Sequence, residues 1–70
     1  MNALALIGMA SEAVPLMIKA GRSLADVIAH LTEATRIVTT AQAEGRDITD
    51  AELDIFKARR HAANQALQNS

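Results

Sequence analysis

Two histidines, His30 and His61, offer the most versatile chemistry in this sequence, because an imidazole can carry a proton or hold a metal ion. Asp26 precedes His30 by four residues and Glu33 follows it by three, so the three side chains would share one face of a helix. A metal site usually needs three or four ligands, and the sequence has neither a histidine pair at helical spacing nor a cysteine to complete one. We therefore predict surface or rim histidines, no metal, no cofactor and no catalytic residue, so the protein is not expected to be an enzyme.

Four basic residues form the second chemical feature. Lys57, Arg59 and Arg60 lie close together, and Arg46 precedes them. A DNA-recognition helix reads bases mainly with its N-terminal residues, and here residues 50–54 include three acids that phosphates would repel. The net charge of −1 adds no general attraction to nucleic acid. We expect these four residues to face a partner protein rather than nucleic acid, with the guanidinium of Arg60 paired to a carboxylate.

The helix that carries this basic segment has the clearest boundaries in the sequence. Thr49 is a favourable N-cap, and Glu52 follows three residues later, where its carboxylate can reach back to the backbone N–H of Thr49. Ile48 and Leu53 have the spacing of a hydrophobic staple, which fixes the direction in which the chain enters the helix. These signals predict a helix over about residues 50–68.

Two more helices are expected before it, over about residues 3–20 and 24–44. Gly21 and Gly45 are placed as their C-terminal stops. Ser23 is a candidate N-cap for the second helix. The chain is therefore predicted to be one all-α domain, residues 1–70.

The first predicted helix is apolar on all sides, with Asn2 as its candidate N-cap. Pro15 removes a backbone N–H within it and predicts a kink or break nearby. A helix that is hydrophobic all round is either covered by an assembly or placed in a membrane. One face carries Leu4, Ile7, Val14 and Ile18, and another face carries Leu6, Ala10, Ala13 and Met17.

The second predicted helix has an apolar row whose members follow one another at steps of four and three residues. Such a row is typical of a helix in a bundle. The connection to the next helix, from Gly45 to Ile48, is short, so we predict that the second and third helices form an antiparallel hairpin. The row consists of Val27, Leu31, Ala34, Val38 and Ala41.

A chain of 70 residues has little capacity to stabilise itself. Half of the residues are hydrophobic, but only one is aromatic. Scaling laws give about 10,700 Å² of accessible surface for the unfolded chain and about 4,200 Å² for the folded one. Hydrophobic burial then nearly cancels the entropy of ordering the chain, and we expect a homo-oligomer to supply the difference. The residues expected to carry self-association are Leu4, Ile7, Val14, Ile18, Val27, Leu31, Val38 and Phe56.

The apolar N-terminal segment also leaves a membrane alternative open. A signal peptide would have a basic residue before its apolar core, and the first one here is Lys19. A transmembrane helix would need about 20 consecutive apolar residues, whereas Glu12 and Pro15 interrupt this segment. The alternative is a membrane-active protein of the holin or antiholin kind, whose first helix inserts into a bilayer or lies on it.

Two runs of sequence resemble a group of phage proteins. AlaGluGlyArgAspIleThrAspAlaGluLeu at residues 43–53 and AlaGlyArgSerLeuAlaAspValIle at residues 20–28 are similar to stretches in small helical accessory proteins of tailed bacteriophages and prophages. The resemblance covers about residues 20–67. It implies a location in the cytoplasm of a bacterial host or in the phage particle, and a role as a minor particle component or as a modulator of a host protein. The function we expect is a non-enzymatic, self-associating helical module for protein–protein interaction.

Overall fold

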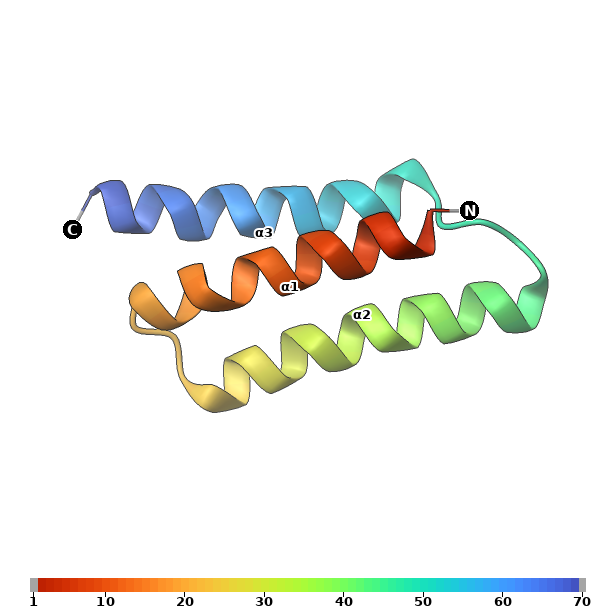
Figure 1. Cartoon of the computed structure of the whole chain (residues 1–70), viewed down its shortest axis with the longest axis horizontal. Coiled ribbons are helices and arrows are strands. Elements are labelled where there is room, and N and C mark those ends of the chain that lie inside the picture. The colour runs from red at the N-terminus through yellow and green to blue at the C-terminus, as the bar shows by residue number, and fades with distance from the viewer. Residues whose placement is uncertain (1, 70) are drawn as a thin grey trace.

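The computed structural model describes residues 2–69 and folds them into three helices (Figure 1). They are α1 (Ala3–Lys19), α2 (Leu24–Glu44) and α3 (Asp50–Gln68). The predicted all-α class is confirmed. The predicted bounds agree with the observed ones, except that α1 ends one residue earlier than expected.

Both α1 and α2 end at the glycines that the sequence marks as stops. Gly21 has φ of 86° and Gly45 has φ of 66°, a left-handed conformation that costs glycine little. In each case the N–H of the residue after the glycine donates to a carbonyl five residues earlier, at 2.9 Å in α1 and 3.0 Å in α2. This bond defines the Schellman motif, which ends a helix sharply and lets the chain reverse.

The helix starts are capped as expected in two cases out of three. The Asp26 N–H donates to Ser23 Oγ at 3.1 Å. The Glu52 N–H donates to Thr49 Oγ1 at 3.1 Å, while the Thr49 N–H donates to Glu52 Oε1 at 3.0 Å, which completes the capping box. The prediction for Asn2 is wrong: its side chain makes no cap hydrogen bond, because its ψ of 8° departs from the extended backbone that an N-cap needs.

α1 continues through Pro15 as one helix, so the expected break is absent. Proline removes the hydrogen bond to the carbonyl four residues earlier, which here belongs to Ser11. Ser11 and Pro15 are both exposed. Solvent can therefore satisfy that carbonyl, and the helix tolerates the proline.

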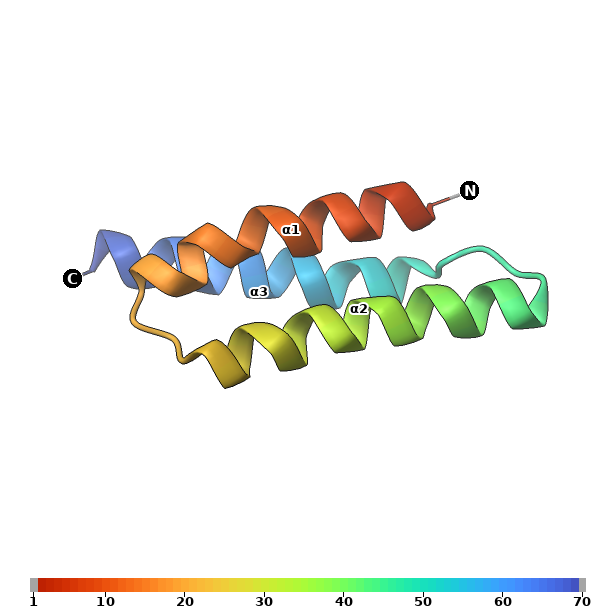
Figure 2. The same ribbon diagram turned by 60° about the horizontal axis from the view of Figure 1, so that its bottom comes forward.

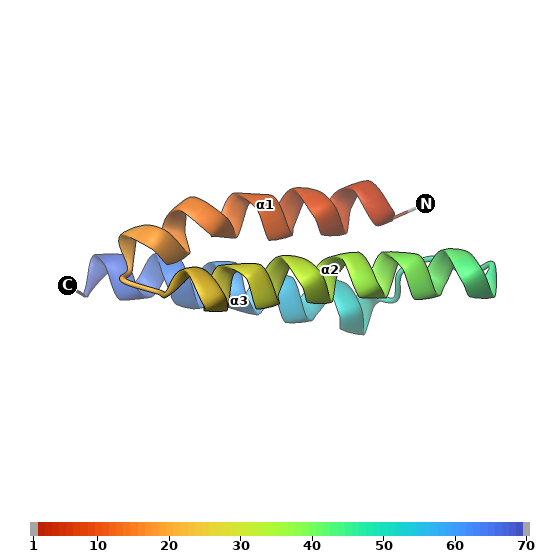
Figure 3. The same ribbon diagram turned by 90° about the horizontal axis from the view of Figure 1, so that it is seen from below.

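α1 is the helix against which the other two pack. In Figure 1 it lies between α2 and α3 and runs in the same direction as α3, while α2 runs the opposite way. Figures 2 and 3, which turn the molecule about its long axis, show α1 along one side of the pair formed by α2 and α3. α2 and α3 are much less closely packed than either is with α1, so the predicted α2–α3 hairpin is not confirmed as a packing unit.

Alanine is the most common residue in the core and makes up five of its eleven buried hydrophobic positions among the described residues. Leu6 and Phe56 are the largest side chains that are fully buried. Alanine lets helices approach closely but removes little apolar area from water. The buried alanines are Ala10, Ala13, Ala34, Ala41 and Ala63.

The molecule is elongated and exposes more surface than a typical chain of its size. Its dimensions are 42 × 21 × 14 Å, and its radius of gyration is 12.5 Å, against about 11 Å expected for 70 residues. Its accessible surface is 4538 Å², above the value of about 4,200 Å² expected from its mass. The three helices therefore leave apolar surface uncovered.

Gly8 lies inside α1 and Gly45 ends α2, so alanine substitutions at these two positions should have opposite effects on stability. Gly8→Ala adds a methyl group that meets no atom within 4 Å in the interior of α1, and should raise the free energy of unfolding by about 1 kcal/mol. Gly45→Ala forces a Cβ into the left-handed region and should lower it by about 1–2 kcal/mol. Urea denaturation at one chain concentration checks both, and equal stability of the two variants would contradict the described α2 C-terminus.

Candidate functional site

Large aliphatic side chains are exposed on α1 and α2. Of the seven among residues 2–69 that are exposed, six belong to these two helices, and the seventh, Ile55, is on α3. Leu4 is 86% exposed and Leu24 is 73% exposed. We use the name apolar face for these six residues together with two partly buried valines beside them: Leu4, Ile7, Val14, Ile18, Leu24, Ile28, Leu31 and Val38.

The apolar face consists of one row on each helix. On α1 the members are three, four or seven residues apart, with Ser11 in the gap. On α2 they are also three, four or seven apart, with Thr35 in the gap. Residues at these spacings lie on the same side of a helix. Each row has the pattern of a helix packed against a partner. Within this chain only Val14 and Val38 pack against the edge of the core, and the six leucines and isoleucines of the rows stay exposed.

Ion pairs to α3 show where the two rows point. Glu12 of α1 accepts from Arg60 at 2.8 Å, and Glu33 of α2 accepts from Arg59 at 2.7 Å, so both glutamates lie on the flank of their helix that faces α3. Glu12 immediately precedes buried Ala13. Val14 follows Ala13. Because the directions of successive side chains differ by about 100° around a helix, Glu12 and Val14 lie on opposite flanks of the buried Ala13, and Val14 points away from α3.

The row of α2 lies in the same way relative to Glu33. Glu33 precedes buried Ala34, and Thr35 follows it on the opposite flank, within the row. Both rows therefore lie on the flanks turned away from α3. Because α1 packs beside α2, the two rows join into one continuous surface along the seam between these helices.

The residues predicted for self-association divide into two groups. Six belong to the apolar face: Leu4, Ile7, Ile18 and Leu31 are exposed, and Val14 and Val38 are partly buried.

The other two lie in the core of this chain. Val27 is 5% exposed and Phe56 is 0% exposed, so neither is accessible to a second chain. The residues predicted for self-association did not include Leu24 and Ile28, although their spacing to Leu31 places them beside that row.

The four basic residues predicted to face a partner are all paired within the chain. Lys57 approaches Asp54 at 3.9 Å, the weakest of these contacts. Arg60 joins α3 to α1 through Glu12, as its predicted carboxylate pairing requires. Arg59 joins α3 to α2, and its guanidinium carbon also lies 5.0 Å from the centre of the Phe56 ring. The charges of these side chains are therefore largely used to connect the helices.

Arg46 is held by the start of α3. Its guanidinium donates to Glu44 Oε1 at 3.0 Å and to Glu52 Oε1 at 2.9 Å. These bonds raise the pKa of Arg46, those from Glu52 having the larger effect. The Arg46 guanidinium, followed by the Thr49 backbone N–H, lowers the pKa of Glu52 from its ordinary value of 4.5 to about 2. Arg46 thus reinforces the capping box.

His30 is buried, so the prediction of a surface or rim position is wrong for it. It is 3% exposed and lies three residues after Val27 and four before Ala34, on the buried side of α2. Its Nε2 donates to the carbonyl of Ala10 at 2.9 Å, and its ring centre lies 5.2 Å from that of Phe56. Nδ1 is buried and has no hydrogen-bond partner among residues 2–69. The other histidine, at position 61, is exposed as predicted.

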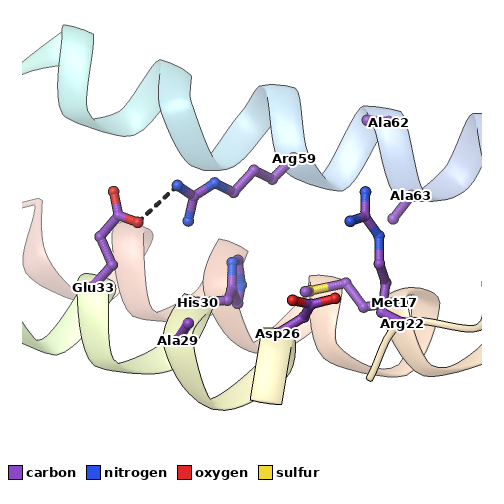
Figure 4. Close-up of a pocket in the computed structure, with 9 residues that line it drawn as sticks. All are labelled: Met17, Arg22, Asp26, Ala29, His30, Glu33, Arg59, Ala62 and Ala63. Atoms are coloured by element: carbon purple, nitrogen blue, oxygen red, sulfur yellow. Dashed lines mark hydrogen bonds and ion pairs between the residues drawn. The ribbon is translucent and has the colours of Figure 1, made fainter. Parts of the chain in front are cut away.

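A cavity of about 290 Å³ lies beside His30, between α2 and α3 (Figure 4). Figure 4 shows Arg59 reaching Glu33 on one side of the imidazole, with Met17, Asp26 and Arg22 on the other. The predicted grouping of Asp26, His30 and Glu33 on one helix face is thus present. Alanines form much of the remaining lining: Ala29, Ala62 and Ala63.

Other site types find no support in the part of the chain that the structure describes. No group of three or more histidine, cysteine, aspartate or glutamate side chains there could hold a metal ion. Each helix in residues 2–69 is too short or too polar to cross a bilayer. No protein-family model, curated protein or solved structure matches the chain.

The low pKa of Glu52 predicts a pH dependence of stability. Because folding lowers this pKa from 4.5 to about 2, ionised Glu52 stabilises the fold fully above pH 4.5, and the contribution is lost as the pH falls toward 2. Glu52→Gln should therefore show a smaller fall in Tm over this range than the unchanged protein. Glu44→Gln, which alters the other partner of Arg46, is the control and should retain the fall. Identical Tm profiles for all three proteins would contradict the role of Glu52.

Proposed function

We propose that the protein is a non-enzymatic interaction module whose apolar face binds a second copy of the chain. The observation that carries this proposal is the distribution of side-chain size. Five alanines occupy the core, while six leucines and isoleucines of α1 and α2 are exposed. A monomer seldom exposes a continuous apolar surface of this kind unless the surface binds something.

The apolar face suits a helical partner of the same shape. α1 and α2 are antiparallel neighbours (Figure 1), so a two-fold axis through their seam would bring four helices together, with α3 on the outside of each chain. α1 is about 26 Å long and two adjacent helices are about 18 Å wide, so each chain would contribute about 470 Å² of projected area. Two chains together approach the ~1,000 Å² expected of a specific interface.

A second copy is favoured over a charged partner because the rows contain no ionisable residue. Each row has one gap on its side of the helix, and the residues in these gaps are Ser11 and Thr35. A two-fold arrangement places apolar row against apolar row without bringing like charges together. Association would also cover part of the accessible surface of the monomer, which at 4538 Å² exceeds the value of about 4,200 Å² expected from its mass.

The biological setting follows from the sequence resemblance alone. We propose that the dimer serves a tailed phage or prophage, as a minor component of the particle or as a modulator of a bacterial host protein. In this arrangement α3 supplies the outward surface for a second partner. Since the basic residues of α3 are paired, recognition there would rest on polar contacts and on Ile55, which is 41% exposed.

Light scattering coupled to size-exclusion chromatography tests the proposal. We expect a dimer at micromolar chain concentration in buffer without detergent. Ile28→Glu places a carboxylate in the apolar face and should weaken dimerisation at least about 100-fold. Ile55→Glu makes the same change on α3 and should leave the dimer intact. A monomer across the whole concentration range, or equal loss in both variants, would overturn the proposal.

Vesicle flotation separates self-association from the membrane alternative, in which α1 lies on a bilayer. The dimer has its apolar face covered, so we expect no flotation with vesicles of neutral or anionic phospholipid. If the protein is monomeric in solution and floats with vesicles, and Ile18→Glu abolishes flotation, the apolar face binds lipid and the holin- or antiholin-like function replaces the one proposed.

A further inference from the structure

The imidazole of His30 is held in one hydrogen-bonding state by α1. A carbonyl oxygen can only accept, so the nitrogen that contacts the Ala10 carbonyl, Nε2, carries the proton. Nδ1 of the neutral ring is then an acceptor, and it is buried without a partner in residues 2–69. Phe56 packs against the ring and restricts its rotation. A buried acceptor of this kind is satisfied when a molecule brings an O–H or N–H group to it.

The cavity beside His30 has room for such a molecule. Its volume of about 290 Å³ is close to that of ten waters in the liquid, at about 30 Å³ each. Alanines from α2 and α3 give it apolar walls, and Met17 is also part of its lining (Figure 4). Nδ1 itself is covered, so a ligand reaches it only when a side chain of the lining moves. Met17 is the most flexible apolar side chain of that lining, and its thioether can change rotamer at small cost.

The rim of the cavity selects the charge of a ligand. Arg59 and Glu33 neutralise each other at 2.7 Å, and Arg59 also lies over Phe56. Arg22 lines the cavity, and it makes no ion pair with any other described residue. Its backbone is fixed, since its N–H donates to the Met17 carbonyl at 2.9 Å. Arg22 can bind one carboxylate, whereas the carboxylate of Asp26, which no described basic side chain pairs, disfavours a second negative charge.

From these three features we propose that the α2–α3 cavity binds a small monocarboxylic acid that carries a hydroxyl group. The carboxylate pairs with Arg22, the apolar body lies against the alanines, and the hydroxyl donates to Nδ1 of His30. Each part of the ligand answers one observed feature of the cavity: an unpaired guanidinium, apolar walls and an unsatisfied acceptor.

The probe for this site is 4-hydroxybenzoate, followed by NMR of the His30 ring nitrogens and of the backbone amides around the cavity. We expect saturable shifts at Nδ1 with a millimolar or lower Kd. Benzoate, which lacks the hydroxyl, should bind about tenfold more weakly. Benzene-1,4-dicarboxylate, in which a second carboxylate replaces the hydroxyl donor, should bind no better than benzoate. Absence of shifts at millimolar probe, or equal binding of benzoate, would overturn the proposal.

Variants locate the site. Ala62→Leu fills the cavity from an exposed position of α3 and should abolish binding. Ala58→Leu, one turn earlier on α3 and outside the cavity lining, should not. Arg22→Gln should weaken binding about tenfold. Circular dichroism verifies that each variant is folded. If Ala62→Leu binds the probe as well as Ala58→Leu does, the cavity is not the site.

This inference does not depend on self-association. The cavity lies on the flank of α2 that faces α3, and the apolar face lies on the opposite flank. Ile28→Glu should therefore bind 4-hydroxybenzoate as the unchanged protein does, whether or not the chain dimerises. Loss of probe binding in Ile28→Glu alone would show that the cavity forms only in the dimer and would overturn the site as described.

Discussion

The close approach of α1 to both other helices is the constraint on which the structure depends. The side of α1 that faces them carries Leu6, Ala10, Ala13 and Met17, so small side chains occupy the middle and larger ones the ends. Small residues let α2 and α3 come near α1, and they also bring the Ala10 carbonyl within hydrogen-bonding distance of His30. These small residues also fill little volume. The exposed residues of the other apolar row of α1, Leu4, Ile7 and Ile18, are not covered within this chain.

Local chemistry explains what the sequence predicted well. A glycine stop or a capping box depends on a few adjacent residues, so the helix bounds could be read without knowing the tertiary structure. The two apolar faces of α1 were also recognised. Which of them faces inward was not, because both are hydrophobic, and the choice depends on the packing of three helices together.

The misplacement of His30 has a physical cause of the same kind. Polar residues are usually exposed, and imidazole seldom counts as a core group. Here a hydrogen bond to a carbonyl 20 residues earlier and a ring contact with Phe56 offset the cost of burial, and both arise only after folding. The spacing of His30 to Val27 and Ala34 was the available signal. The internal pairing of Arg46, Arg59 and Arg60 likewise depends on tertiary positions.

The alanine-based core has a consequence for how mutations would accumulate in this protein. Truncation can do little harm where the side chain is already a methyl group, so sensitivity to shortening is concentrated at the larger buried side chains. These are Leu6, Met17, Val27, Ile48, Leu53 and Phe56. Enlargement is the opposite case, since any longer side chain at Ala10, Ala13 or Ala34 would push two closely packed helices apart. Sequence drift at these buried alanine positions should therefore be restricted to small residues. The packing sets an upper limit on side-chain size there but no lower limit.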